Sequence, residues 1–111
     1  MSTGDDAKAP ATARIVHDNS ALNRYELKLG DSTAFATYSR EPGRVTLIHT
    51  EVPKELGGHG VGTALAAGAL ADIRARGQKV IAKCSFIAAF IRSHKKFQDL
   101  LADPSSLDTE K

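Results

Sequence analysis

The sequence predicts an α/β domain of the α+β kind, with a mixed, mostly antiparallel sheet and two main helices. Three observations support this prediction. Short stretches that alternate apolar and polar residues are separated by turn residues in the first half of the chain. A glycine cluster and a long stretch with helical spacing follow, and then a second strand and helix. A helix between two strands predicts a parallel or splayed pair joined by a right-handed crossover.

The predicted strands are short. Tyr25, Leu27 and Leu29 alternate with charged residues, which is typical of a half-buried strand. Turns at 30–32 and 41–43 favour an antiparallel meander. The strands are expected at residues 14–17, 25–29, 34–38, 45–52 and 79–83.

The two predicted helices differ in length. The first begins near Gly60, carries apolar residues every four positions from 61 to 73, and ends at Gly77. The second is expected after Ser85, whose hydroxyl suits an N-cap. The stripe of Phe86, Phe90 and Phe97 is expected to lie in the core, with packing against a cofactor as the alternative.

Composition narrows the possible roles of the chain. Its 111 residues predict one domain at 13–101, with a disordered tail at 1–12 and a flexible tail at 102–111. A net charge of +2 argues against a nucleic-acid partner. Cys84 is the single cysteine, so no intrachain disulfide forms and a cytoplasmic location is expected. No stretch suits a signal peptide or a membrane span.

The junction at residues 45–63, VTLIHTEVPKELGGHGVGT, points most directly to function. A strand leads through a glycine loop into a helix. Such a loop offers free backbone N–H groups and a partial positive charge to an anion such as phosphate. The alternative interpretation is a tight turn that needs flexible residues.

In this junction the chain resembles the GNAT superfamily of acetyl-CoA-dependent N-acyltransferases, whose signature is Gln/Arg-x-x-Gly-x-Gly/Ala. The segment Gly57–Gly62 matches the final glycines, although Gly57 stands at the Gln/Arg position, for which Lys54 partly compensates. The chain is most similar to the short single-domain branch of the superfamily. That branch has motifs like His49–Pro53 and Cys84–Ile91 on either side of the glycine loop.

The resemblance implies a compact GNAT-like fold whose fourth and fifth strands splay apart to admit acetyl-CoA as cosubstrate. It implies transfer of an acetyl group from acetyl-CoA to a primary amine of unknown identity. The strand main chain would bond the pantetheine arm, and the loop amides would hold the pyrophosphate. The residues expected to bind the cosubstrate are Thr50, Val52, Gly57, Gly58, His59, Gly60, Val61, Gly62 and Thr63.

Three residues are candidates for catalysis. His49 and Glu51 lie two apart on a strand, hence on one face, and can take a proton from an ammonium substrate. The alternatives are a polar strand face or a buried histidine whose hydrogen bonds are satisfied. Cys84 can protonate the leaving thiolate, accept the acyl group as a nucleophile, or be a small buried hydrophobe. The tyrosine that many GNAT enzymes use as general acid would fall near Arg92, so a phenol is missing there.

Other functions remain as alternatives. The four histidines lack metal-ligand spacing, so no metal is expected. A non-catalytic acyl-CoA-binding or protein-interaction module is the main rival to the enzyme. The chain is expected to act as a monomer or a homodimer, because so small a fold can complete an acceptor site across a dimer.

Overall fold

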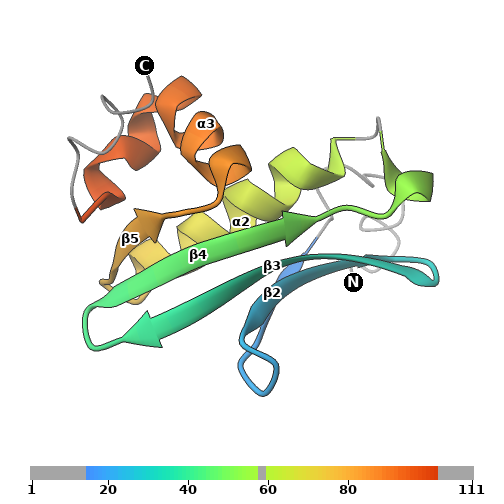
Figure 1. The fold of residues 1–111 in the computed structure, drawn as a ribbon, viewed down its shortest axis with the longest axis horizontal. Helices are drawn as coiled ribbons and strands as arrows, with labels where there is room; N and C mark the ends of the chain where they lie inside the picture. The colour runs from blue at the N-terminus through green and yellow to red at the C-terminus, as the bar shows by residue number, and fades with distance from the viewer. Residues whose placement is uncertain (1–14, 58–59, 103–111) are drawn as a thin grey trace, which may run out of the picture.

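The structure is a computed structural model that describes residues 15–57 and 60–102. It confirms the predicted α+β fold, in which one sheet packs against helices (Figure 1). The strands are β1 (Val16–Asn19), β2 (Arg24–Leu29), β3 (Ser32–Glu41), β4 (Arg44–Glu51) and β5 (Lys79–Ala82). The helices are α2 (Val61–Ala75) and α3 (Ser85–Ser93), and the short 3-10 helices are η1 (Lys54–Leu56) and η2 (Lys95–Leu100).

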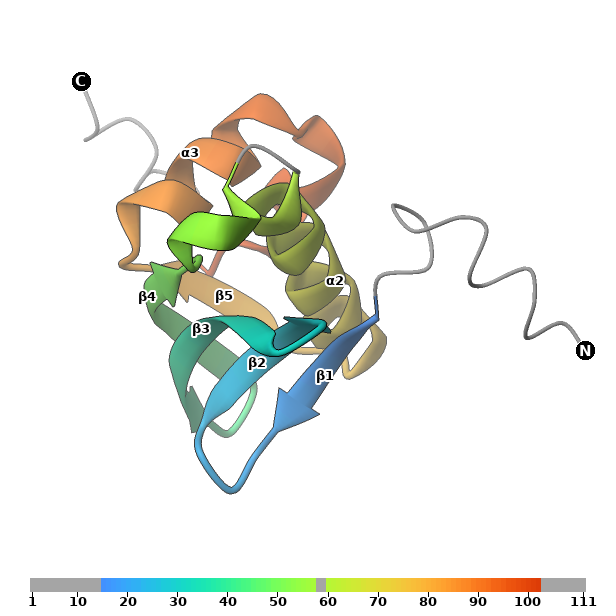
Figure 2. The same ribbon diagram turned by 90° about the vertical axis from the view of Figure 1, so that its right-hand side faces the viewer.

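The sheet order is β1-β2-β3-β4-β5, and only the last pair is parallel. The antiparallel meander follows from the short turns, and the parallel pair follows from the α2 crossover. Figure 2 shows α2 on one face of the sheet, which we call the inner face. The opposite face is called the outer face.

Strands β4 and β5 diverge partway along their length. Their pairing ends where Leu47 meets Ala82. The N–H groups of Lys83 and Cys84 then both donate to the oxygen of Leu47, at 3.0 Å each. Strand β4 continues to Glu51 without a β5 partner, and we call the region between the diverging strands the β4–β5 gap.

A β-bulge lies where this gap begins. Tyr38 pairs with Leu47 and Thr37 pairs with His49, so Ile48 is the extra residue on β4. A bulge breaks the alternation of side chains and redirects the residues that follow it. Ile48 and His49 are therefore both exposed, and Thr50 is half-buried.

Helix α2 packs closely on the inner face through its small residues. Leu65, Ala69 and Ile73 are fully buried there. A Cβ atom placed on Gly68 would lie 2.3 Å from Cγ2 of Val16, so only glycine permits this approach to β1. The predicted stop at Gly77 is confirmed, with a left-handed φ of 70° and a bond from the next N–H to Ile73 O.

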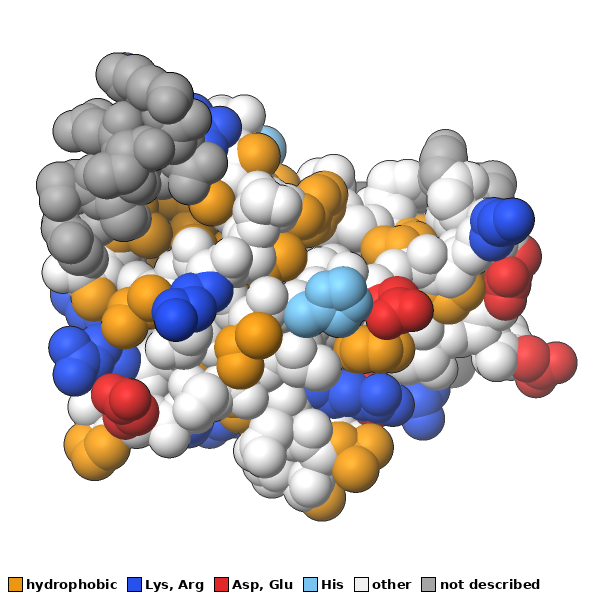
Figure 3. Space-filling view, in the orientation of Figure 1, with side chains coloured by type: hydrophobic (Ala, Val, Ile, Leu, Met, Phe, Trp, Pro, Cys, Tyr) orange, Lys and Arg blue, Asp and Glu red, His pale blue; other side chains and the backbone are white. Residues whose placement is uncertain are grey.

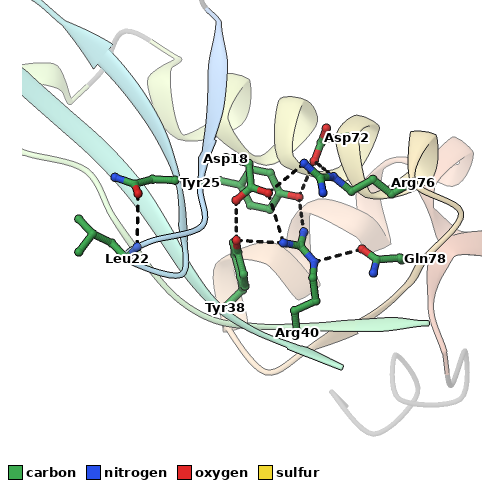
Figure 4. A network of polar contacts seen from close by, with 9 residues as sticks. Asp18, Leu22, Tyr25, Tyr38, Arg40, Asp72, Arg76 and Gln78 are labelled. Atoms are coloured by element: carbon green, nitrogen blue, oxygen red, sulfur yellow. Dashed lines mark hydrogen bonds and ion pairs between the residues drawn. The ribbon is translucent and has the colours of Figure 1, made fainter. Parts of the chain in front are cut away.

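Two tyrosines anchor the sheet to the C-terminal half of α2 (Figure 4). The Tyr25 hydroxyl donates to Asp72 Oδ2 at 2.7 Å, and the Tyr38 hydroxyl donates to Asp18 Oδ1 at 2.5 Å. Arg40 donates to both phenol oxygens, at 2.9 Å to Tyr25 and 3.0 Å to Tyr38. These bonds join β1, β2, β3 and α2 at one end of the domain.

The charges in this cluster balance. Arg40 donates to Asp18 at 3.2 Å, while Arg76 donates to Asp72 at 2.7 Å and lies 3.0 Å from Asp18. Burial raises the pKa of Asp72, but bonds from Tyr25 and Arg76 outweigh it, so the pKa is lowered. We call the cluster the tyrosine–arginine network; it comprises Asp18, Tyr25, Tyr38, Arg40, Asp72 and Arg76.

Two predictions about the second helix are wrong. Ser85 is the first residue of α3 rather than its cap, because Cys84 keeps an extended backbone and stands at the N-cap without a side-chain bond. Phe90 and Phe97 are buried as predicted, but Phe86 is 41% exposed. Phe86 therefore does not complete a core stripe.

Candidate functional site

The first turn of α2 has no side-chain cap among the described residues. Its N-cap is Gly60, which has a left-handed φ of 72° and makes no side-chain capping bond. The first bond into the helix runs from Ala64 N–H to Gly60 O, so the amides of residues 61–63 precede the helical ladder. An uncapped helix start of this kind favours an anion.

Three elements meet beside this turn. A Cβ atom on Gly62 would lie 3.0 Å from the ring end of Phe86 and 3.6 Å from Cγ2 of Val52. The first turn of α2, the residue after β4 and the first turn of α3 are thus in contact. Phe86 is partly exposed at this meeting point, and the absence of a side chain at Gly62 lets its ring pack close to the backbone of the helix start.

A buried pair lies across the β4–β5 gap. The Cys84 thiol donates to Thr50 Oγ1, with sulfur and oxygen 3.3 Å apart. Cys84 is buried, and Thr50 is half-buried. The bulge at Ile48 is what turns Thr50 toward Cys84. This Cys84–Thr50 pair bridges β4 and the start of α3.

A second pair lies on the outer face of β4. His49 Nε2 is 3.2 Å from Glu51 Oε1, which agrees with the expectation that both side chains share one face. Their side chains are 61% and 60% exposed. Thr37 donates to the carbonyl of His49 and ties the strand to β3. The His49–Glu51 pair is therefore positioned by the sheet and open to solvent.

Most of the predicted site residues gather around the β4–β5 gap. Thr50, Val52 and Cys84 border the gap, and Gly60, Val61, Gly62 and Thr63 form the turn at its end. His49 and Glu51 lie on the other side of β4. Gly57 is placed nearby, but its N–H donates to Lys54 O at 3.0 Å and closes η1. Gly58 and His59, predicted to hold phosphate, lie outside the described residues.

Neither of the chain's two tyrosines places its hydroxyl in this gap, although Tyr38 pairs with Leu47 where the gap begins. Both phenols are held in the tyrosine–arginine network, where Asp72 and Asp18 accept hydrogen bonds from the two hydroxyl groups. The pKa of Tyr38 is raised, mainly by burial and next by the hydrogen bond to the Asp18 carboxylate. In residues 15–57 and 60–102, no group of histidines, cysteines and carboxylates could hold a metal ion. No helix in these same ranges is both long and apolar enough to cross a bilayer.

Sequence reasoning missed two features of this region. The partly exposed Phe86 was assigned to the core, because helical spacing does not show which part of a helix overhangs a gap. The bulge at Ile48 was missed because the residue looks like any apolar strand residue. Its identity as the extra residue depends on the pairing of β4 with β3.

Comparison with known proteins agrees with this geometry. Residues 24–100 match the family described as GCN5-related N-acetyl-transferase. The match begins at the first residue of β2 and runs to the end of η2, so it contains the gap and every candidate residue. No curated protein matches the chain. The chain belongs to the GCN5-related N-acetyltransferase family.

Proposed function

We propose that this protein transfers an acetyl group from acetyl-CoA to a primary amine. The observation that carries the proposal is the convergence of two features on one gap. The uncapped first turn of α2 touches Phe86, and the buried thiol of Cys84 lies two residues before Phe86 in the chain. A diphosphate held at the helix start therefore has its thioester arm directed along β4 toward a sulfur-bearing residue.

The cosubstrate would use main-chain groups rather than charged side chains. The amides of Val61, Gly62 and Thr63 would hold the pyrophosphate, together with the predicted ligands Gly58 and His59. Beyond Leu47, the free edge of β4 would bond the pantetheine arm as a strand does. A β4 amide in this stretch would also donate to the thioester oxygen as negative charge develops on it.

Acyl transfer needs a proton removed from the amine and a proton supplied to sulfur. The amine nitrogen would attack the thioester carbonyl, forming the C–N bond as the C–S bond breaks. The His49–Glu51 pair would accept the proton that the ammonium group loses. Cys84 would donate a proton to the departing thiolate, the role for which no phenol is available in the gap.

A covalent route is the alternative chemistry for Cys84. Its thiolate would attack the thioester first, releasing CoA and leaving an acetylated cysteine, which the amine would then deacylate. The Thr50 hydroxyl accepts a bond from the thiol in the structure and would orient the sulfur on either route.

The rival is a module that binds acyl-CoA without turnover. The engagement of both phenols in the tyrosine–arginine network favours it, because no phenol then serves as general acid. The open His49–Glu51 pair favours the enzyme. A thiol-release assay with acetyl-CoA and a panel of amines separates the two, since only an enzyme releases CoA in an amine-dependent manner.

Cys84→Ala tests the chemical role of the thiol. We expect acetyl-CoA affinity by calorimetry to stay near that of the wild type, and kcat to fall by about 100-fold or more, the usual share of a proton-transfer group. Thr50→Val is the matched control, because it removes the hydrogen bond and keeps the thiol. Full activity of Cys84→Ala would show that this residue only packs in the core. Absence of acetyl-CoA binding by the wild type would rule out the proposed function.

A further inference from the structure

The outer face of the sheet carries a row of exposed side chains beside the β4–β5 gap. Ile48 is 47% exposed on the bulge, and the His49–Glu51 pair follows it along β4. On β5, Ile81 is half-buried, and the exposed Lys83 follows the end of this strand at Ala82. Figure 3 shows this face, with a histidine and an acidic side chain side by side and hydrophobic side chains near them.

Lys83 lies beside the bulge because its N–H bonds to Leu47, the residue before Ile48. Within the described part of the chain, Lys83 forms no ion pair. The order along the face is thus a cation, an aliphatic side chain, a histidine and a carboxylate. This row, which we call the outer row, consists of Lys83, Ile48, His49 and Glu51.

The stretch of chain that contains Lys83 carries a net positive charge. From β5 to the end of η2 the chain is basic, and Asp99 is its sole acidic residue in that stretch. The net positive charge of this stretch favours an acidic partner over a basic one. The basic residues of this stretch are Lys79, Lys83, Arg92, Lys95 and Lys96.

We propose that the acceptor is a protein lysine in an acidic sequence, bound across the outer row. This inference rests on the proposed acetyl transfer. The acceptor's acidic residue would pair with Lys83, its apolar neighbour would cover Ile48, and its lysine ammonium would reach the His49–Glu51 pair. The chemistry that this surface recognises is a carboxylate and an apolar group next to an amine.

Exposure argues for a macromolecule rather than a free amine. Small ligands bind in concave sites that bury most of their surface. Here the two proton-accepting side chains are about three-fifths exposed, so a small amine gains few contacts with them. In a peptide, the residues next to the lysine can shield the amine from solvent, and the extended backbone can lie along the sheet face. Substrate and surface together would then exclude water from the amine.

Acetylation of matched peptides tests this inference. Each peptide carries one lysine beside leucine, with aspartates, arginines or serines at the flanking positions; free lysine and spermidine serve as small amines. We expect the aspartate peptide to exceed the small amines by at least about tenfold in kcat/KM. It should exceed the arginine peptide by about two- to fivefold at low salt, the range of a solvent-exposed ion pair. Added salt should erase the second difference.

Charge reversal identifies the residue responsible. Lys83→Glu should invert the preference, so that the arginine peptide becomes the better acceptor. Lys28→Glu makes the same charge change on the outer face of β2, away from the outer row. This control variant should keep the wild-type preference for the aspartate peptide. Because the readout is a ratio between two peptides, it does not depend on the amount of folded enzyme.

Each other outcome has a defined meaning. If a small amine is acetylated better than every peptide, the inference is overturned while acetyl transfer stands. The same holds if Lys83→Glu keeps the aspartate preference, or if the protein is a dimer whose partner covers the outer row. If acetyl-CoA binds but no acceptor releases CoA, the proposed function fails as well.

Discussion

The two ends of helix α2 are built in opposite ways. At the C-terminal end, the tyrosine–arginine network joins the helix to three strands, and each of its carboxylates has both a tyrosine and an arginine partner. At the N-terminal end, Gly60 caps the helix without a side-chain bond, and Gly62 has no side chain of its own beside the Phe86 ring. One end has its polar groups satisfied by side chains of the protein, and the other has no side-chain cap among the described residues, which suits the anion site proposed above.

This difference separates stability from function along a single helix. Buried polar groups cost free energy unless they are paired, so the paired network should add to the stability of the fold. Unpaired amides at a solvent-accessible helix start cost little, because water bonds to them until an anion replaces it. Substitutions at the two ends should therefore affect different measurements.

The largest expected effect is at the network end. Arg40→Ala removes the donor shared by Tyr25, Tyr38 and Asp18, and should lower the free energy of unfolding by about 1.5–3 kcal/mol. Urea titration measures this change. Arg44→Ala, which breaks the exposed pair with Glu41, should cost less than about 1 kcal/mol. A similar loss in both variants would mean that the network does not hold the helix.

The next effect should appear in binding and not in stability. Gly62→Val places a branched side chain against Phe86 and over the amides of the first turn. We expect acetyl-CoA affinity to fall by about 30-fold, or roughly 2 kcal/mol, the value of a lost bond to a charged group. Calorimetry gives the affinity, and urea titration should show a change below about 1 kcal/mol.

Gly62→Ala provides the graded control for this variant, because it adds only the Cβ atom. Its affinity should lie between those of the wild type and Gly62→Val. Unchanged affinity in both variants would remove the first turn of α2 from the acetyl-CoA site and erase the contrast between the two ends.

The smallest effect concerns the charge of Asp72. Its pKa is lowered in the folded state, so the ionised carboxylate stabilises the fold above the unfolded pKa of about 3.9, and this contribution is lost as pH falls through the folded pKa. Asp72→Asn should cost less than about 1 kcal/mol at pH 7, since the side chain is 37% exposed.

The difference between this variant and the wild type should shrink as pH falls, because wild-type Asp72 then becomes neutral too. Unfolding free energies at pH 7, 5 and 3 follow this change. A difference that stays constant with pH would show that hydrogen-bond geometry, and not charge, is what the carboxylate contributes at this end of α2.

Several parts of this structure were readable from local patterns. The apolar spacing of α2, its stop at Gly77 and the shared face of His49 and Glu51 all follow from the periods of helices and strands. The tyrosine–arginine network was not readable, because Tyr25 and Asp72 are 47 residues apart and no spacing rule joins them. The cap at Ser85 was mispredicted because side-chain chemistry alone does not fix where the backbone turns.

The sequence by itself determined the order of strands and helices, the glycine-rich helix start and the presence of a single thiol. Only the tertiary structure decided on which side of β4 each candidate residue lies. That choice depends on the bulge at Ile48, and a bulge exists only relative to the paired strand β3. Local propensity sets the elements, whereas pairing between strands places Thr50 beside Cys84 and leaves His49 and Glu51 on the open face.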